Sequence, residues 1–251
     1  MTLLYEFPLS HFCEKARWAL DHHRVPFQAR PLSPGLHVPA LKRLGVPDTT
    51  VPVLRWSGQT LQGSAAIIDA LDAAAPARAL TPLDPGAAAE VARWETLADQ
   101  AFGDDMRRVA YALLLEEPPA VIAMWTTHAP FWMPWVYRAL WSQVVLGIRK
   151  KYRMRPERVV ASREAFLQAL DALDAQIDGR RYVVGDRLTR ADIAIAALLS
   201  PLVQPAERPW RSPVAPPAAF ATWQAELRSR PFWAWVEARY REDRGPHITP
   251  M

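Results

Sequence analysis

Residues 2–23 read TLLYEFPLSHFCEKARWALDHH, an apolar run followed by a proline and then a segment with interspersed charges. Thr2–Phe7 has the apolar, aromatic and β-branched composition of a strand. Cys13–His23 has small apolar residues at helical spacing. Because a helix N-terminus favours anions, this strand-to-helix step places Ser10 and Cys13 where a thiol or its anion can be held. Taken alone, the same pattern is also that of an ordinary serine N-cap.

Three further segments extend this strand and helix into a small mixed α/β unit. Phe27–Leu32 has the composition of a second strand. Val51–Trp56 and Gln59–Gln62 are separated by a two-residue turn that contains glycine, which predicts a β-hairpin. Ser64–Ala75 returns to helical spacing, with Ser64 as the expected N-cap. The order of these elements predicts a β-α-β unit followed by a hairpin and a helix.

A segment rich in alanine and proline separates this unit from a longer helical one. We place the first domain at residues 1–76, the linker at 77–87 and an all-helical domain at 88–251. Within the second domain, Thr189 and Asp192 have the spacing of a capping box at a helix start. The sequence therefore predicts a mixed α/β domain followed by an all-α domain.

Composition limits the classes of function. Half of the 251 residues are apolar and 22% are charged, which is ordinary for a globular protein. The single cysteine, Cys13, excludes an internal disulfide framework and suits a reducing compartment, so we expect a cytoplasmic protein. The N-terminus has neither a basic stretch nor a long apolar run, so we expect no cleaved leader. His22 and His23 have no partners at metal-ligand spacing, so we expect no metal site.

The positive charge is concentrated in one place. Residues 149–158 contain six basic residues and one acid, whereas the formal charge of the whole chain is only +4. The rest of the chain is close to neutral, which is not the pattern of a nucleic-acid-binding protein. This basic cluster is either the solvated end of a helix or a patch for anionic lipid or an acidic partner.

Two more segments have features of a ligand site. Pro52 stands at the mouth of a strand, where a cis bond after Val51 would turn the preceding backbone toward an extended peptide. Leu61–Ile67 reads LQGSAAI, a strand end, turn and helix start, where Ser64 and its neighbours offer a second anion site. Each motif alone is unspecific, and their order along the chain makes them informative.

In this order the motifs resemble the thioredoxin-like domain of cytosolic glutathione S-transferases. Ser10-His11-Phe12-Cys13 resembles the Ser-x-x-Cys segment of the serine-type classes, with Arg17 where that segment usually keeps a basic residue. Val51-Pro52 matches the cis-proline dipeptide, Leu61–Ile67 matches Leu-x-Glu-Ser-x-Ala-Ile, and Thr189-x-x-Asp192 matches the capping box of the helical domain. The resemblance covers both domains and is greatest to theta- and phi-like bacterial members.

The resemblance implies glutathione as co-substrate and a hydrophobic electrophile as second substrate. Ser10 would donate a hydrogen bond to the glutathione sulfur and stabilise the thiolate, without a covalent enzyme intermediate. The Val51 backbone would pair with the cysteinyl peptide, Ser64 would bind the γ-glutamyl carboxylate, and His37 has the spacing of a residue that contacts the glycyl carboxylate. The implied glutathione-binding residues are thus His37, Val51, Pro52, Gly63 and Ser64. The family also implies a detoxifying homodimer.

Two departures from the family pattern fall at the ends of the implied ligand. Gly63 stands where the family usually has Glu or Gln, and Thr50 stands where a Lys or Gln often reaches the glycyl carboxylate. Each lost charge-assisted contact would weaken binding by roughly 1.5–3 kcal/mol. A second hypothesis is therefore a non-catalytic ligand-binding protein on the same fold.

Cys13 supports a third hypothesis, glutathione-dependent thiol exchange or peroxidase chemistry. In cysteine-type relatives, however, the reactive thiol is at the first position of the segment, which Ser10 occupies here. We therefore expect Cys13 to be packed inside the first helical turn.

Residues 118–158 form an enlarged, aromatic-rich segment of the helical domain. Residues 118–137 carry no formal charge and have the length of a membrane span, but four prolines argue against one continuous helix. The favoured hypothesis is an enlarged wall of the electrophile pocket. The alternatives are core packing of a long helix pair and peripheral contact with a membrane surface.

Overall fold

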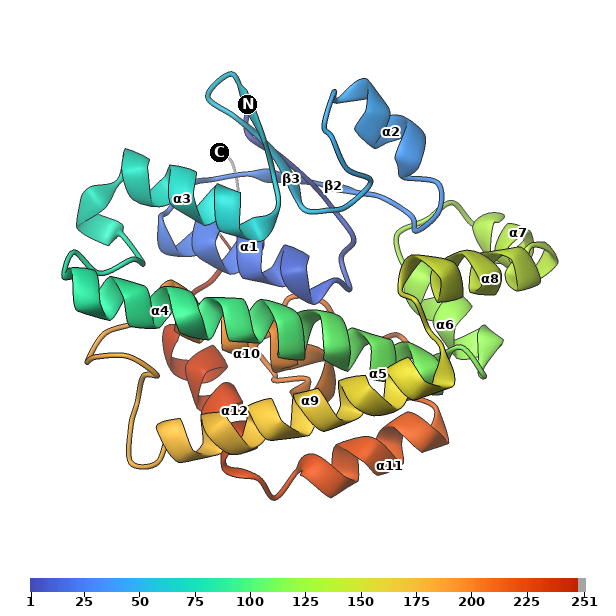
Figure 1. The fold of residues 1–251 in the computed structure, drawn as a ribbon. Coiled ribbons are helices and arrows are strands. Elements are labelled where there is room, and N and C mark those ends of the chain that lie inside the picture. Colours follow the sequence, from blue (N-terminus) through green and yellow to red (C-terminus); the bar gives the residue numbers. More distant parts are fainter. Residues whose placement is uncertain (248–251) are drawn as a thin grey trace.

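A single four-stranded sheet lies near the top of the molecule in the computed structural model, which describes residues 1–247 (Figure 1). Residues 248–251 of the expected helical domain lie outside the described residues. The strands are β1 (Leu3–Glu6), β2 (Gln28–Pro31), β3 (Val53–Trp56) and β4 (Gln59–Gln62), in the order β2-β1-β3-β4. β1 is parallel to β2 and antiparallel to β3, which in turn is antiparallel to β4. All four strands lie within predicted strand segments.

Three helices complete the first domain. α1 (His11–His22) and α3 (Ser64–Ala74) lie between the sheet and the helical domain, as Figure 1 shows. The short helix α2 (Val38–Arg43) was not predicted, because six residues give too few turns for a visible apolar period. The sequence predicts Ser64 as the N-cap of α3, but Ser64 is the first residue of the helix. Gly63 takes the cap position because the chain turns there with φ 92°, a conformation that favours glycine.

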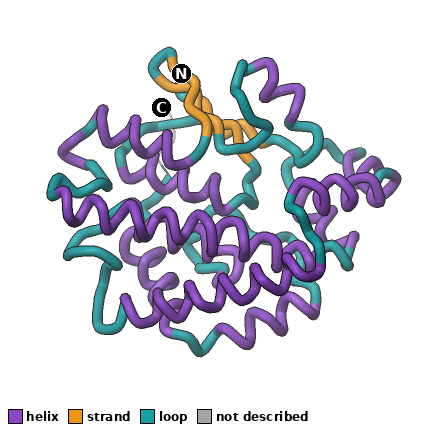
Figure 2. Tube along the Cα trace, viewed as in Figure 1, coloured by secondary structure: helices purple, strands orange, loops and turns teal. Residues whose placement is uncertain are grey.

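The second domain is helical throughout (Figure 2). A 3₁₀ turn, Pro76–Arg78, leads to its first helix, which begins at Pro85, before the end of the expected linker. The helices are α4 (Pro85–Leu97), α5 (Met106–Leu114), α6 (Pro118–Trp125), α7 (Met133–Ala139), α8 (Trp141–Lys151), α9 (Pro156–Gln176), α10 (Arg190–Val203), α11 (Ala218–Leu227) and α12 (Pro231–Asp243). A π-helical segment, Ala98–Asp105, joins α4 directly to α5.

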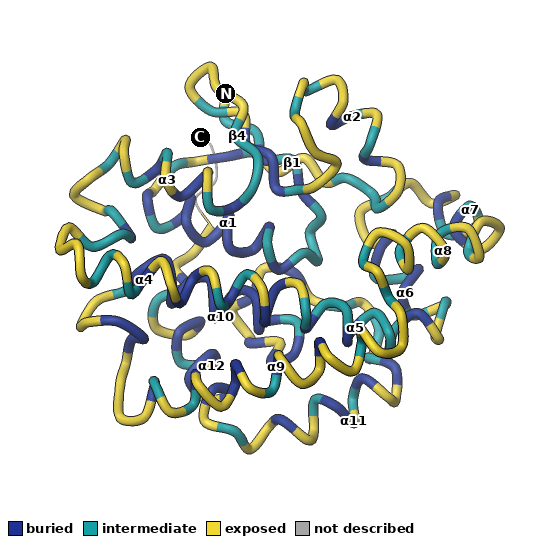
Figure 3. Tube along the Cα trace, in the orientation of Figure 1, coloured by how far each residue is buried: buried dark blue, intermediate teal, exposed yellow. Residues whose placement is uncertain are grey.

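Helix α10 is the centre of the core (Figure 3). Nearly every residue of α10 is buried, including its first turn. Its start confirms the predicted capping box, because the Thr189 backbone N–H donates to the Asp192 carboxylate at 2.8 Å and the Asp192 backbone completes the reciprocal contact. A buried helix start needs this internal pairing because water cannot satisfy its free N–H groups.

The aromatic-rich segment is broken into α6, α7 and α8. These helices enclose a small apolar cluster of their own, made of Val121, Ile122, Trp125, Met133 and Tyr137. The Tyr137 hydroxyl donates to the Pro34 carbonyl and so fixes α7 to the loop before α2. Within residues 1–247, no helix is both long enough and apolar enough to cross a membrane.

Candidate functional site

The sheet topology brings the predicted site positions to one edge. Ser10 follows β1 and His37 follows β2, and these two strands run in the same direction. Val51 and Pro52 precede β3, which runs the opposite way, while Ser64 follows β4. Strand ends and strand starts therefore meet at the same edge of the sheet. The convergence of four separate chain segments defines the candidate site.

Ser10 caps helix α1. Its backbone is extended, with φ −71° and ψ 127°, and its hydroxyl oxygen accepts from the Cys13 backbone N–H at 3.4 Å. This bond is long, and Ser10 is only half-buried. The hydroxyl proton is therefore available to an anion at the positive end of the helix.

Cys13 lies on the inner side of the same turn. Its side chain is fully buried, and burial raises the pKa of the thiol to about 12. The neighbouring Glu6 raises this pKa further, while Arg17 opposes the effect. A thiol with this pKa is almost entirely protonated at neutral pH.

The peptide bond between Val51 and Pro52 is cis, as the sequence had suggested. The Gly63 N–H donates to the Pro52 carbonyl at 2.9 Å, so the cis-proline turn and the start of α3 are joined directly. Ser64, the next residue, is buried. The backbone at Pro52 thus lies next to the start of α3, where Ser64 stands.

Gln62 holds the loop before the cis proline and was not singled out from the sequence. Its side-chain amide donates to the carbonyls of Asp48 and Thr50 at 2.9 and 2.8 Å, and its oxygen accepts from the Asp48 N–H at 3.1 Å. The only signal in the sequence was its place next to Gly63, where the family usually has a carboxylate or amide. In this chain the amide lies one position earlier and fixes the loop.

His37 is buried behind this loop. Its Nε2 lies 2.9 Å from the Thr49 carbonyl, and its ring packs edge-on against Phe7 at 4.8 Å. Burial lowers the pKa of His37, and the positive charge of Lys151 lowers it further. A neutral His37 ring with Nε2 engaged on Thr49 positions the loop, and Lys151 is near enough to act on this ring electrostatically.

Two residues of the helical domain that sequence analysis missed, Gly103 and Arg107, contact the first turn of α1. His11 is buried with Nε2 at 3.2 Å from the Gly103 carbonyl, and a side chain at Gly103 would collide with the Phe12 ring. The Arg107 guanidinium lies 5.4 Å from the Phe12 ring and 4.7 Å from the Tyr152 ring. The π-helical turn that places Gly103 here has no sequence signature that we recognised, although such turns are frequent at functional sites.

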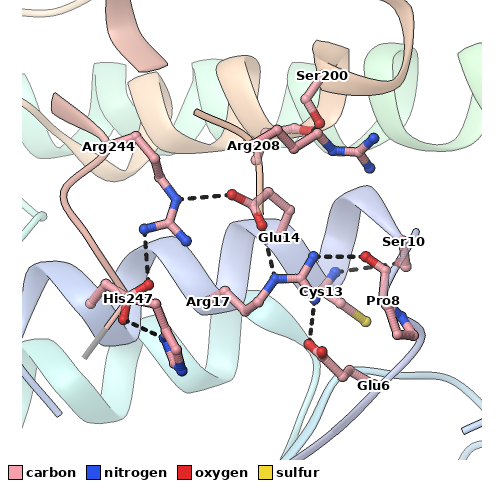
Figure 4. Close-up of polar contacts among 12 residues, drawn as sticks. Glu6, Pro8, Ser10, Cys13, Glu14, Arg17, Ser200, Arg208, Arg244 and His247 are labelled. Atoms are coloured by element: carbon pink, nitrogen blue, oxygen red, sulfur yellow. Dashed lines mark hydrogen bonds and ion pairs between the residues drawn. The ribbon is translucent and has the colours of Figure 1, made fainter. Parts of the chain in front are cut away.

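A buried ionic network lies behind the first turn of α1, as Figure 4 shows. Glu14 accepts from Arg17 at 2.8 Å and from Arg244, near the C-terminus, at 2.9 Å. Burial opposes ionisation of Glu14, but these two guanidinium groups outweigh it and lower its pKa. Arg17 also donates to the Pro8 carbonyl, and Arg208 donates to the Leu9 carbonyl at 2.8 Å. The network therefore fixes the loop that carries Ser10.

A cavity of about 300 Å³ borders this network. It is lined by Phe27 and Ala29 at the β2 edge, by Trp210 and by the ionic groups Arg17 and Arg244. None of Ser10, Val51 and Ser64 lines it. Within residues 1–247, no group of three metal-ligating side chains lies together.

Comparison with known protein families defines the class to which this fold and site belong. Residues 4–79 match the N-terminal domain model of glutathione S-transferases, and residues 125–209 match the C-terminal domain model. The two matches together span more than half of the chain. The chain belongs to the glutathione S-transferase family, with a thioredoxin-like first domain and an all-α second domain, as predicted.

Solved structures give the same architecture over the full chain. A glutathione S-transferase from Rhodospirillum rubrum F11 is 23% identical, with 100% of this chain and 96% of that chain covered and a TM-score of 0.56. A theta class enzyme from Xanthomonas axonopodis pv. citri, solved with glutathione bound, is 20% identical, with 99% of each chain covered and a TM-score of 0.58. The β-etherase LigF of Sphingobium sp. strain SYK-6 is 18% identical, with coverages of 94% and 98% and a TM-score of 0.62. No curated protein matches the sequence.

Proposed function

We propose that the protein is a glutathione transferase that joins the glutathione thiolate to a hydrophobic electrophile. The observation that carries the proposal is the half-buried Ser10 hydroxyl at the start of α1, at the sheet edge that also holds the cis Val51-Pro52 bond and Ser64. The structures similar to this chain include a theta class enzyme that was solved with glutathione bound.

In this mechanism Ser10 acts on the sulfur of glutathione. Its O–H donates to the thiolate, and the N-terminal end of α1 adds a partial positive charge. The Val51 backbone pairs with the cysteinyl part of glutathione, the Ser64 hydroxyl binds the γ-glutamyl carboxylate, and the turn of Pro52 and Gly63 forms the floor between them. Stabilising the thiolate and positioning it beside the electrophile are the two contributions of the protein.

Lys151 compensates for the anchor that is missing at Thr50. The last turn of α8 is fixed because Arg108 donates to the Tyr152 carbonyl at 2.9 Å and Arg107 packs on the Tyr152 ring. From there the Lys151 ammonium lies close enough to His37 and Asp48 to interact with both electrostatically. Under the proposed function, Lys151 binds the glycyl carboxylate of glutathione.

The glycyl ethyl ester of glutathione tests this role because it lacks the carboxylate. We expect the native protein to bind free glutathione about two- to fivefold more tightly than the ester, the range of an exposed ion pair. In Lys151→Ala this preference should disappear, while Lys150→Ala should retain it. Calorimetric titration of both ligands measures the effect, and an unchanged preference in Lys151→Ala contradicts the assignment.

Calorimetry with glutathione itself and a conjugation assay with a panel of electrophiles test the main proposal. We expect heat at millimolar glutathione and turnover of at least one hydrophobic electrophile. Absence of binding would favour the non-catalytic alternative, which rests on Gly63 and Thr50. Glutathione binding with disulfide reductase activity that is lost in Cys13→Ser would favour thiol exchange, against which the burial and raised pKa of Cys13 stand.

The proposal includes a detoxifying homodimer in the cytoplasm. The family resemblance supports the dimer, and the lone buried Cys13 fits a reducing compartment. Light scattering coupled to size-exclusion chromatography tests the assembly, and a monomer at assay concentration would remove the dimer from the proposal.

A further inference from the structure

Large apolar side chains are exposed in one part of the helical domain. Five of the nine exposed large apolar residues among residues 1–247 fall between positions 131 and 146. Phe131 is 89% exposed, Leu146 is 69% exposed and Trp135 is 66% exposed, and Trp132 and Leu140 complete the group. Such a concentration marks an interaction surface, whereas single exposed apolar residues are normal.

The exposure belongs to the outer faces of α7 and α8, whose inner faces are already packed. Met133 and Tyr137 of α7 are buried in the cluster around Trp125, and Trp141 and Val144 of α8 pack against it. The exposed residues of α7 recur at helical spacing on the opposite side. Both helices lie at the outer edge of the molecule in Figure 1. These outer faces are therefore left over after the local core is complete.

The chain around this surface carries a net positive charge. Residues 118–156 contain six basic residues and no acid, whereas the whole chain has a formal charge of +4. The Arg138 guanidinium lies 5.2 Å from the Trp135 ring, so a cation stands directly beside the most exposed tryptophan. Three further cations, Arg149, Lys150 and Lys151, form the last turn of α8.

This combination selects one kind of partner. Tryptophan beside Lys and Arg is the composition of segments that lie in the interface of a bilayer, with the rings at the level of the head groups. Arg149 is paired with Glu116 at 3.2 Å, but the surface keeps a net positive charge. A second copy of this chain therefore fits poorly, because two surfaces of the same net charge repel one another. The broken helices α6, α7 and α8 also suit a segment that lies on a bilayer and does not cross it.

We propose that the outer faces of α7 and α8, with the loop that contains Phe131, form a docking surface for an anionic lipid bilayer. Trp132, Trp135 and Leu146 enter the head-group region, and the basic residues contact lipid phosphates. Each Lys or Arg near an anionic membrane strengthens the binding. Binding is peripheral, and it weakens as salt screens the charges.

Vesicle flotation of the full-length protein tests the proposal. We expect binding to vesicles of mixed phosphatidylglycerol and phosphatidylcholine, and little binding to phosphatidylcholine alone. The double variant Trp132→Ser, Trp135→Ser should bind anionic vesicles at least tenfold more weakly. Leu83→Ser is the matched control, since Leu83 is 93% exposed outside the surface, and it should bind as the native protein does.

A second pair of variants tests the charge. Lys150→Glu with Arg155→Glu should weaken binding to anionic vesicles at least tenfold, whereas Arg228→Glu, an exposed arginine of the same domain, should have a small effect. Circular dichroism melting shows whether each variant is folded. The proposal is overturned if the native protein binds neither vesicle, or if the tryptophan variant binds as well as Leu83→Ser. Tryptophan-dependent self-association without vesicle binding also overturns it and identifies a second copy as the partner.

Discussion

The N-cap of α1 and the helical turns that follow it differ in burial and in hydrogen bonding. Ser10, at the start, is half-buried, and the hydrogen bond that its hydroxyl accepts from the Cys13 N–H is long, at 3.4 Å. Glu14, one turn later, is fully buried and accepts hydrogen bonds from Arg17, Arg244 and Tyr240. Lys15 is equally buried and pairs with Glu95 and Asp99 at 2.9 and 2.7 Å.

This difference separates two tasks within one helix. A group that must bind a ligand needs unused hydrogen-bonding capacity, and the hydrogen bond that Ser10 accepts within the protein is weak. A helix that must hold that group still needs fixed partners, and the charged side chains of α1 obtain them from α4, the π-helical segment and the chain near residue 244. The comparison predicts that a substitution at the N-cap, Ser10, changes chemistry, while substitutions within the helix change stability.

The largest effect is expected at Glu14. Glu14→Ala leaves Arg17 and Arg244 buried without their shared carboxylate, and breaking such a pair costs about 3–5 kcal/mol of unfolding free energy. Urea denaturation followed by circular dichroism measures the loss. Glu116→Ala, which breaks the exposed pair with Arg149, is the control and should cost less than about 1 kcal/mol. Equal losses in the two variants would break the comparison.

Ser10→Ala should show the opposite pattern. We expect kcat/KM at neutral pH to fall roughly tenfold to hundredfold, which is about 1.4–2.7 kcal/mol of transition-state stabilisation. The pKa of bound glutathione, followed by thiolate absorbance, should rise because the hydroxyl donor is gone. Unfolding free energy should change little, and Ser10→Thr should restore the lower pKa. Activity that is indifferent to Ser10→Ala would show that the chemistry lies elsewhere.

Cys13 tests where the boundary between the two tasks lies. Cys13→Ala removes a buried sulfur and should cost about 1 kcal/mol of stability. Because the native thiol has a pKa of about 12, the pH profile of conjugation should be unchanged. A shifted profile, or loss of turnover with stability intact, would place Cys13 with Ser10 on the chemical side.

The smallest effect is a pH dependence at the C-terminal end of α1. Asp72 accepts from His23 and from the Leu80 and Thr81 backbone, and although burial opposes ionisation these bonds lower its pKa from 3.8 to about 2. The stability that Asp72 contributes is complete above about pH 4 and is lost as pH falls through about 2. Native protein should therefore lose more stability than Asp72→Asn between these values in thermal melts. Parallel losses would remove this contribution.

The parts of the molecule that follow local rules could be predicted from the sequence. Strand-like composition and a turn that contains glycine located the four strands, and the Thr189 and Asp192 pair located the start of α10. The order of Ser10, Val51-Pro52 and Ser64 along the chain indicated the family, and the strand order β2-β1-β3-β4 then shows that these residues meet at one sheet edge.

The remaining site residues could not be predicted because their roles depend on distant contacts. Arg208 reaches the Leu9 carbonyl from about 200 positions away, and Lys151 interacts electrostatically with Asp48, about 100 positions earlier in the chain. The basic cluster at residues 149–158 was visible in the sequence, but the direction in which each of its side chains points was not. Tertiary packing alone determines which of its members faces the site and which face the solvent.

The bond between Arg244 and Glu14 joins residues 230 positions apart, and this has a consequence for synthesis. A chain that grows from its N-terminus can form the sheet and α1 early, but it lacks the second cation for Glu14 until residue 244 has left the ribosome. Until then a buried carboxylate has only Arg17 as its ionic partner. The domain that is translated first is therefore the one that is completed last.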